Sequence, residues 1–204
     1  MSPGRRKVGR TRALARTVRE ARACTLCAQR LPLGPRPGLR AKAAARILIV
    51  GQAPGTRVHE TGIPWNDASG DRLRAWTGLT RETFYDDELI AIVPMGFCYP
   101  GQNEKGGDRP PIPECAALWH PRIVPRLLEV RLTLLVGTYA QRFYLGSERG
   151  KTVAETVGRW RDFLPSYLPL PHPSWRTQAW ERRRPWFARD LLPELKKRIR
   201  DLIY

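Results

Sequence analysis

The stretch ILIVGQAPGTRVHETGIPW (residues 47–65) decides the fold. Its first four residues form an apolar, largely β-branched run, which is typical of a strand buried on both faces. A turn rich in glycine and proline follows directly and carries polar side chains to the carboxyl end of that strand. In open α/β sheets, ligands bind at this end of the strands. The stretch therefore predicts a buried parallel strand with a binding site at its end.

The rest of the chain alternates between strand and helix patterns. Strands are predicted at residues 46–51, 89–97, 132–137 and 164–170. Helices are predicted at residues 11–23, 69–77, 113–130, 138–145 and 184–203, and Pro/Gly-rich loops at residues 31–45 and 100–111. Strands separated by helices indicate a parallel sheet covered on both faces. We therefore expect an α/β protein with three layers, α/β/α, around a central four-stranded parallel sheet.

The composition limits the classes of function. A chain of 204 residues has the length of one domain with a full core. No apolar run approaches the roughly 20 residues that a membrane helix needs. The formal net charge is +17, from 36 basic and 19 acidic side chains, and such an excess favours a polyanionic partner because Lys and Arg release counterions from phosphates. We expect a DNA or RNA partner, no membrane contact and a cytoplasmic location.

The first 22 residues differ from the rest in composition. They carry eight basic side chains and a single acidic one, and they lack the apolar segment of a secretory signal. Like charges in a block repel one another, so the first part is expected to be disordered. We therefore divide the chain into a basic, flexible N-terminal arm at residues 1–22 and one domain at residues 23–204, and we expect a monomer.

Four cysteines form a second signal. Cys24 and Cys27 make a C-x-x-C, while Cys98 and Cys115 flank the Pro/Gly-rich loop at residues 100–111. Their number and uneven spacing do not suit a disulfide scaffold. Four thiolates can hold a 4Fe-4S cluster or a structural zinc ion, and the spacing does not distinguish the two. Four buried free thiols are the alternative.

The turn after the first predicted strand has the features of a binding loop. Gly51 and Gly55 permit close approach of the backbone, and Pro54 stiffens the turn. Gln52 offers both a donor and an acceptor. Trp65 provides a flat face on which a base can stack, with packing in the core as the alternative.

The segment after the last predicted strand forms a third signal. His172 is held between two prolines, and a neutral imidazole there can donate a hydrogen bond to a developing oxyanion. Ser174 can hold a phosphate. Trp175 and Arg176 combine an apolar and a basic side chain, a pair suited to wedging into a DNA groove. His120 lies within a predicted helix and is expected to be structural.

These signals, in this order, resemble the uracil-DNA glycosylase superfamily, most closely its iron-sulfur family 4. That family carries G-E-A-P-G, then G-x-P-F-V-G-x-A-G, cysteines in C-x-x-C, C-R-P-P and P-x-x-x-E-x-x-x-C, and finally H-P-S. The resemblance extends from Cys24 to the C-terminus. The corresponding segments are CTLC (24–27), GQAPG (51–55), GIPWNDASG (62–70), CYPG (98–101), PPIPEC (110–115) and HPS (172–174).

The resemblance implies a DNA glycosylase of base-excision repair, a hydrolase that breaks the N-glycosidic bond of uracil or another deaminated base. It implies that the nucleotide flips out of the DNA into a pocket, that its base stacks on Trp65, and that His172 stabilises the leaving base. It also implies a 4Fe-4S cluster on Cys24, Cys27, Cys98 and Cys115. The residues expected to bind the substrate are Gly51, Ala53, Pro54, Gly55, Trp65 and Ser174, with Trp175 and Arg176 against the DNA.

The chain departs from the family at the positions that carry chemistry. Gln52 replaces the catalytic Glu, and Ala53 stands where other branches have Asp or Asn. Pro94 stands where the family has an Asn that reads the edge of uracil, so either backbone groups read the base or the substrate differs. Asp67 is the nearest substitute for the missing acid. His59 and Glu60 are second-rank candidates.

Two other functions are compatible with these residues. The first is a DNA-binding protein of the same fold that has lost the chemistry, which the changes at Gln52, Ala53 and Pro94 favour. The second is a zinc-containing module that binds RNA or single strands, with Trp65 and Trp175 stacking on bases. Release of a base and the content of iron and sulfide separate the three functions.

Overall fold

The computed structural model describes residues 3–104 and 106–204, with side chains from residue 8 onward. Within these residues, parallel strands form one four-stranded sheet in the order β2-β1-β3-β4. The strands are β1 (Ile47–Val50), β2 (Ile90–Ile92), β3 (Leu132–Val136) and β4 (Tyr167–Leu170). The predicted central parallel sheet is confirmed.

Helices connect the strands. In the described part of the chain they are α1 (Pro3–Arg22), α2 (Thr56–Thr61), α3 (Ala68–Thr77), α4 (Arg81–Phe84), α5 (Pro113–Ile123), α6 (Thr138–Leu145), α7 (Val153–Gly158), α8 (Thr177–Arg182) and α9 (Leu192–Ile203). The helix predicted at residues 138–145 coincides with α6, and the helix predicted at residues 69–77 differs from α3 by one residue. None of the helices described is long and apolar enough to cross a bilayer.

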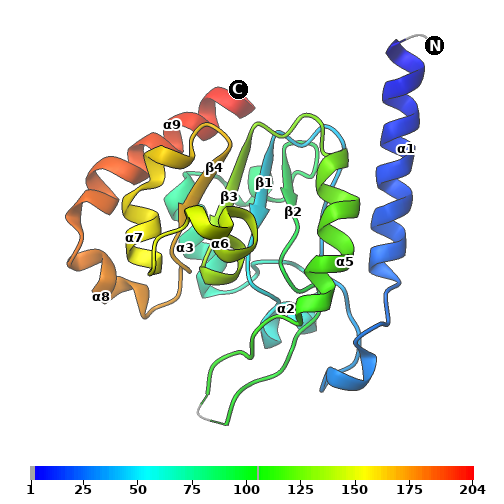
Figure 1. Cartoon of the computed structure of the whole chain (residues 1–204), viewed down its shortest axis with the longest axis horizontal. Coiled ribbons are helices and arrows are strands. Elements are labelled where there is room, and N and C mark those ends of the chain that lie inside the picture. The colour runs from blue at the N-terminus through cyan, green and yellow to red at the C-terminus, as the bar shows by residue number, and fades with distance from the viewer. Residues whose placement is uncertain (1–2, 105) are drawn as a thin grey trace.

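Different helices cover the two faces of the sheet. Successive side chains of a strand point to opposite faces, so Leu48 and Val50 of β1 pack into the core cluster that includes α1, α5 and α6. Ile47 and Ile49 pack into the cluster that includes α3, α7 and α9. Figure 1 shows α1 and α5 to one side of the strands and α7 and α9 to the other. The predicted three-layer α/β/α architecture is confirmed.

The strand order creates a binding position. Strands β1 and β3 are neighbours, and the connection that leaves β1 leads to β2 on one side, whereas the connection that leaves β3 leads to β4 on the other side. In doubly wound sheets, a crevice forms outside the carboxyl ends of the strands at such a switch point. The turn that begins at Gly51 leaves β1 at this place, as expected from the sequence.

Proline explains most of the boundaries that differ from the predictions. Strand β2 ends at Ile92 rather than at residue 97 because Pro94 has no N–H for the ladder, although residues 93, 95 and 96 still donate hydrogen bonds to β1 and its turn. Strand β4 begins after Pro165 for the same reason. Helix α5 ends at Ile123 rather than at residue 130, two residues before Pro125. The predicted closing helix is divided into a π-helical turn and α9.

The N-terminal segment differs from the expectation of a disordered first part. Helix α1 begins at Pro3, and its second half packs against α5 and the turn that follows it through Leu14, Val18 and Ala21, all buried. Because these apolar side chains recur at helical spacing, they hold α1 alongside α5. Figure 1 shows the first half of α1 extending past α5, away from the end of the sheet at which α2 lies.

Candidate active site

A pocket opens at the carboxyl ends of the strands and contains about 550 Å³ of free space, including the part open to solvent. It brings together residues that are up to 134 positions apart, from Gly38 to His172. Eight of the sequence-predicted site residues line it: Gly51, Gln52, Ala53, Pro54, Gly55, Trp65, Asp67 and His172. Ser174, Trp175, Arg176, His59 and Glu60 are not among the residues that line it.

Trp65 occupies an unusual backbone position in this pocket. Its φ of 59° lies in the left-handed region, which is strained for a bulky residue. Two glycines make room for it: a Cβ on Gly51 would lie 2.6 Å from Cζ2 of the indole, and a Cβ on Gly70 would lie 1.7 Å from the Trp65 carbonyl oxygen. The indole centroid is 5.9 Å from that of the His172 ring. The strained backbone thus holds the flat indole beside the imidazole.

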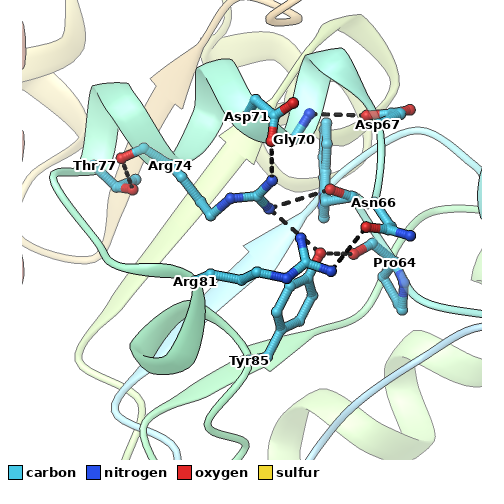
Figure 2. A network of polar contacts seen from close by, with 10 residues as sticks. Pro64, Asn66, Asp67, Gly70, Asp71, Arg74, Thr77, Arg81 and Tyr85 are labelled. Carbon is cyan, nitrogen blue, oxygen red and sulfur yellow. Dashed lines mark hydrogen bonds and ion pairs between the residues drawn. The ribbon is translucent and has the colours of Figure 1, made fainter.

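A buried arginine fixes the segment that carries Trp65. Arg74 of α3 is only 8% exposed, and its Nη1 donates to the Trp65 carbonyl at 3.2 Å and to the Tyr85 hydroxyl at 3.3 Å. The same hydroxyl donates to the carbonyl of Pro64 at 2.9 Å. Figure 2 shows Arg74 reaching from α3 toward Tyr85, with Asp71 on its other side. The carbonyl of the strained residue Trp65 and the carbonyl of Pro64 before it are therefore each held by a side-chain hydrogen bond.

His172 is positioned by a closed turn after β4. Its carbonyl oxygen accepts hydrogen bonds from the Ser174 N–H at 2.9 Å and from the Thr177 hydroxyl at 2.5 Å. Arg72 of α3 donates to the Ser174 carbonyl at 2.9 Å and pairs with Glu181 of α8. The turn is thus tied to the helix that also carries Arg74, so that His172 and Trp65 share one scaffold.

The electrostatics of the pocket favour a neutral imidazole. Burial lowers the pKa of His172, and the negative charge of Asp67 opposes this shift without cancelling it. A ring whose pKa is below its ordinary value of about 6.5 is neutral at pH 7 and can donate one N–H. This state suits the role expected for His172, which is to donate to an oxygen that gains negative charge.

Asp67 caps a helix and also lines the pocket. Its Oδ1 accepts the N–H of Gly70 at 2.8 Å, so it caps the N-terminus of α3. An Asp at this position satisfies a backbone donor and interacts favourably with the helix dipole. One carboxylate oxygen is therefore already used, which weakens the expectation that Asp67 replaces the missing acid.

Substitutions at Asp67 separate the cap from the charge. We expect Asp67→Ala to lower the free energy of unfolding by about 0.5–2 kcal/mol, and Asp67→Asn to preserve most of it because Asn caps equally well. Both variants remove the charge that raises the pKa of His172, so that pKa falls further in both. Denaturant unfolding and NMR titration of the imidazole measure the two effects. An equal loss of stability in the two variants would contradict the capping role.

Gln52 does not provide a substitute for a catalytic carboxylate. Its Nε2 donates to the carbonyl of Arg109 at 3.4 Å, which links the Gly51 turn to the loop at residues 100–111. The backbone beside it is also fixed, because the Gly96 N–H donates to the Gln52 carbonyl at 2.8 Å. The amide therefore has a role in docking a loop.

His120 is structural, as expected. It is 2% exposed and lies behind the pocket, where its Nε2 donates to the carbonyl of Pro94 at 3.0 Å. Its Nδ1 accepts from the Tyr144 hydroxyl at 2.6 Å, and burial lowers its pKa, which agrees with a neutral ring. Pro94 thus lines the pocket, while its carbonyl already has a donor.

Comparison with known families agrees with this arrangement. The family model described as the uracil DNA glycosylase superfamily matches residues 37–196, most of the chain. The chain belongs to the uracil DNA glycosylase superfamily. Proteins of this superfamily act on DNA. The matched residues include the whole pocket and exclude Cys24 and Cys27, so the match does not decide between the branches of the superfamily.

Two residues that the sequence predicts to contact DNA, Trp175 and Arg176, lie next to this pocket. Trp175 is 72% exposed, and the guanidinium of Arg176 lies 5.2 Å from the centre of its indole ring. Nη1 of Arg176 also lies 3.9 Å from the position of a Cβ on Gly107, in the loop that docks on Gln52. An exposed aromatic ring beside a cation gives the rim of the pocket both apolar and positive character.

The four cysteines meet in a second cavity. Cys24, Cys27, Cys98 and Cys115 all line a cavity with about 430 Å³ of free space, including the part open to solvent, and its other walls are mostly apolar. The N–H of Phe97 donates to Sγ of Cys115 at 3.3 Å, and Nη2 of Arg30 donates to Sγ of Cys27 at 3.7 Å. Burial raises the pKa of Cys115 to about 12. Among the described residues, no three Cys, His, Asp or Glu side chains converge closely enough for a single metal ion.

The cysteine cavity and the pocket at the carboxyl ends of the strands share a wall. Gly96 lines the cysteine cavity, and its N–H holds the Gln52 carbonyl on the pocket side. A Cβ on Gly96 would lie 3.3 Å from Cβ of Ala53 and 3.0 Å from Cβ of Pro111, so the two loops close on it from both sides.

Sequence reasoning missed three residues that shape the site. Arg72 and Arg74 both face inward from α3, and only the carbonyls that they hold explain why. Asp108 lines the pocket from the loop at residues 100–111. The two arginines could have been noticed because they are charged residues within a helix that must bury one face against the sheet. No sequence motif includes Asp108.

Proposed function

We propose that this protein is a DNA glycosylase that hydrolyses the N-glycosidic bond of uracil or another deaminated base. The observation that carries the proposal is the pairing of Trp65 and His172 in one pocket at the carboxyl ends of the sheet, with ring centres 5.9 Å apart. Trp65 supplies a stacking face and His172 supplies a hydrogen-bond donor. The net charge of +17 supports a DNA substrate.

The chemistry follows from the charges that develop as the bond breaks. The sugar carbon C1′ becomes positive, and the departing base takes the electron pair of the C–N bond. The neutral ring of His172 donates its N–H to a carbonyl oxygen of that base, and such a donor in a partly desolvated site is worth about 2.7–4 kcal/mol of barrier. The target base must first leave the duplex, and Trp65 compensates part of the lost stacking.

The rim of the pocket supplies contacts to the DNA around the flipped nucleotide. Trp175 is exposed enough to fill the space that the base leaves, and Arg176 carries its charge toward the phosphates. Ser174 lies outside the pocket, beside the turn that holds His172, where its hydroxyl can accept or donate to a phosphate.

Release of the base from defined oligonucleotides tests the proposal. The protein, in excess, is incubated with single- and double-stranded oligonucleotides that carry one uracil, hypoxanthine or xanthine, and alkali then cuts at abasic sites. We expect cleavage with at least one of these substrates. If DNA is bound but never cleaved, the proposal is wrong, and the protein is a DNA-binding protein of the same fold. The engagement of Gln52 with a backbone carbonyl, in place of a catalytic acid, is the observation that favours this second function.

We propose in addition that Cys24, Cys27, Cys98 and Cys115 hold a 4Fe-4S cluster. Their common cavity and its apolar walls support this proposal. Four thiolates can ligate either this cluster or a single tetrahedral zinc ion. The cluster would tie residues 24–31 to the loop at residues 96–98, and it has no part in breaking the glycosidic bond.

The content of iron and sulfide tests the cluster. Protein purified without oxygen is expected to contain both and to show charge-transfer absorption, whereas Cys115→Ser should lose both. Because Cys115 also accepts the N–H of Phe97, we expect a lower thermal midpoint in this variant. Stoichiometric zinc without sulfide would instead favour the single-ion alternative and a module that binds single strands.

A further inference from the structure

The base pocket contains two carboxylates, and they differ in what already binds them. Asp67 and Asp108 both line the pocket. Oδ1 of Asp67 accepts the backbone N–H of Gly70. The carboxylate of Asp108 has no hydrogen-bond or ion-pair partner among the described residues, so both of its oxygens are available to a substrate or to water.

The loop that carries Asp108 has a defined shape. Its two arms are joined by the antiparallel bridge between Gln102 and Asp108, by the hydrogen bond from Asn103 N–H to the Gly107 carbonyl at 2.9 Å, and by the hydrogen bond from Arg109 N–H to the Gly101 carbonyl at 2.8 Å. Gly101 and Gly107 have φ values of 93° and 91°, which a larger residue would adopt only with strain. Asp108 therefore stands at a fixed position near the base of a hairpin.

The hairpin is docked on the turn that lacks the expected acid. Nε2 of Gln52 donates to the carbonyl of Arg109, the residue next to Asp108. On the same turn, the position of a Cβ on Gly55 lies 3.4 Å from Oδ2 of Asp108. The residue that replaces the catalytic Glu thus helps to bring a different carboxylate to the same turn.

The surroundings of Asp108 suit a proton acceptor. Burial raises its pKa, and the nearby charge of Asp67 raises it further. The other ionisable group that lines the pocket is His172, which is neutral at pH 7, and Nη1 of Arg176 lies 3.9 Å from the position of a Cβ on Gly107, the residue before Asp108. A carboxylate with a raised pKa is a stronger base, and Asp108 remains accessible to the water that it would activate.

We propose, on the basis of the proposed function, that Asp108 is the catalytic carboxylate of the glycosylase reaction. It accepts a proton from a water molecule whose oxygen forms a bond to C1′ of the deoxyribose. The C1′–N bond breaks and its electron pair leaves with the base, which His172 stabilises. The negative charge of Asp108 also favours the positive charge that develops on the sugar.

Three isosteric variants test the assignment under single-turnover conditions: Asp108→Asn, Asp67→Asn and, as a matched control on the same loop, Glu104→Gln. We expect Asp108→Asn to slow base release by about 10²–10⁴-fold while DNA binding and the thermal midpoint stay unchanged. We expect a much smaller loss for Asp67→Asn and no change for Glu104→Gln, which does not line the pocket.

The dependence on pH provides the second readout. Because a raised pKa means that Asp108 takes up its proton at a higher pH than an ordinary Asp, the wild-type rate should fall as the pH is lowered through that pKa. Asp108→Asn should lack this fall. Equal rates for Asp108→Asn and Glu104→Gln would overturn the assignment while leaving the glycosylase activity intact. A wild-type protein that releases no base would overturn both.

Discussion

Base release by His172→Ala is expected to be about 10²–10³-fold slower than by the wild type under single-turnover conditions. The imidazole is the only nitrogen donor that we assign to the leaving base, and its direction is fixed by the turn that Ser174 and Thr177 close. Because the effect is on the chemical step, binding of the substrate DNA should change little.

Two further variants make this prediction specific. His172→Asn retains a side-chain N–H donor and should recover part of the lost rate. His59→Ala removes a histidine close in sequence to the Gly51 turn but outside the pocket, so it should release the base at the wild-type rate. An unchanged rate in His172→Ala, with the fold intact, would rule out His172 as the donor.

Gly70→Ala is expected to destabilise the protein by about 1–3 kcal/mol and to abolish most of its base release. The added Cβ would lie 1.7 Å from the carbonyl oxygen of Trp65, a backbone atom that Arg74 holds in place. Either α3 or the 64–66 segment must move, and each movement displaces the indole from its position beside His172. Denaturant unfolding and the base-release assay measure the two losses.

Gly9→Ala is the matched control for this substitution. Gly9 also lies within a helix, but no heavy atom lies within 4 Å of the position that its Cβ would take. Alanine has a higher helix propensity than glycine by about 1 kcal/mol, so this variant should be as stable as the wild type or more stable. Equal stability of Gly70→Ala and Gly9→Ala would show that the Trp65 segment is not packed against Gly70.

The sheet and the main wall of the pocket could be predicted because strong local patterns encode them. Buried parallel strands require apolar runs such as Ile47–Val50, and the ligand site of such a sheet lies at the carboxyl ends of its strands. The residues placed there from the sequence, from Gly51 through Trp65 to His172, do line one pocket. The two motifs are far apart in the chain, yet the topology of the sheet suffices to bring them together.

Short helices and inward-facing charges could not be predicted in the same way. Helices of four to six residues, such as α2 and α7, are too short for an apolar period to stand out. The capping pattern formed by Thr152 and Glu155 was the available signal for α7. Arg74 is stabilised in the interior by carbonyls that only the folded chain brings to it, so its burial is a tertiary effect.

The position of Asp108 illustrates the same limit at the site. Its loop is rich in glycine and proline, a composition that predicts a surface connection and gives no direction for a side chain. What aims Asp108 at the pocket is the docking of the hairpin on Gln52, a contact between residues 57 positions apart. The absence of the family's acid at Gln52 could be recognised from the sequence, whereas the proposal of Asp108 in its place required the fold.

The wall at Gly96 has a practical consequence for replacing the four cysteines of this protein. Gly96 lines the cavity of the thiols on one side, and its N–H donates to the Gln52 carbonyl of the Gly51 turn on the other. A redesigned cysteine cavity must therefore be refilled to the same shape, since an inward collapse of the Gly96 backbone would carry Gln52 and Ala53 with it. Substrate preference is thus a sensitive measure of whether such a redesign has preserved the original spacing between the two cavities.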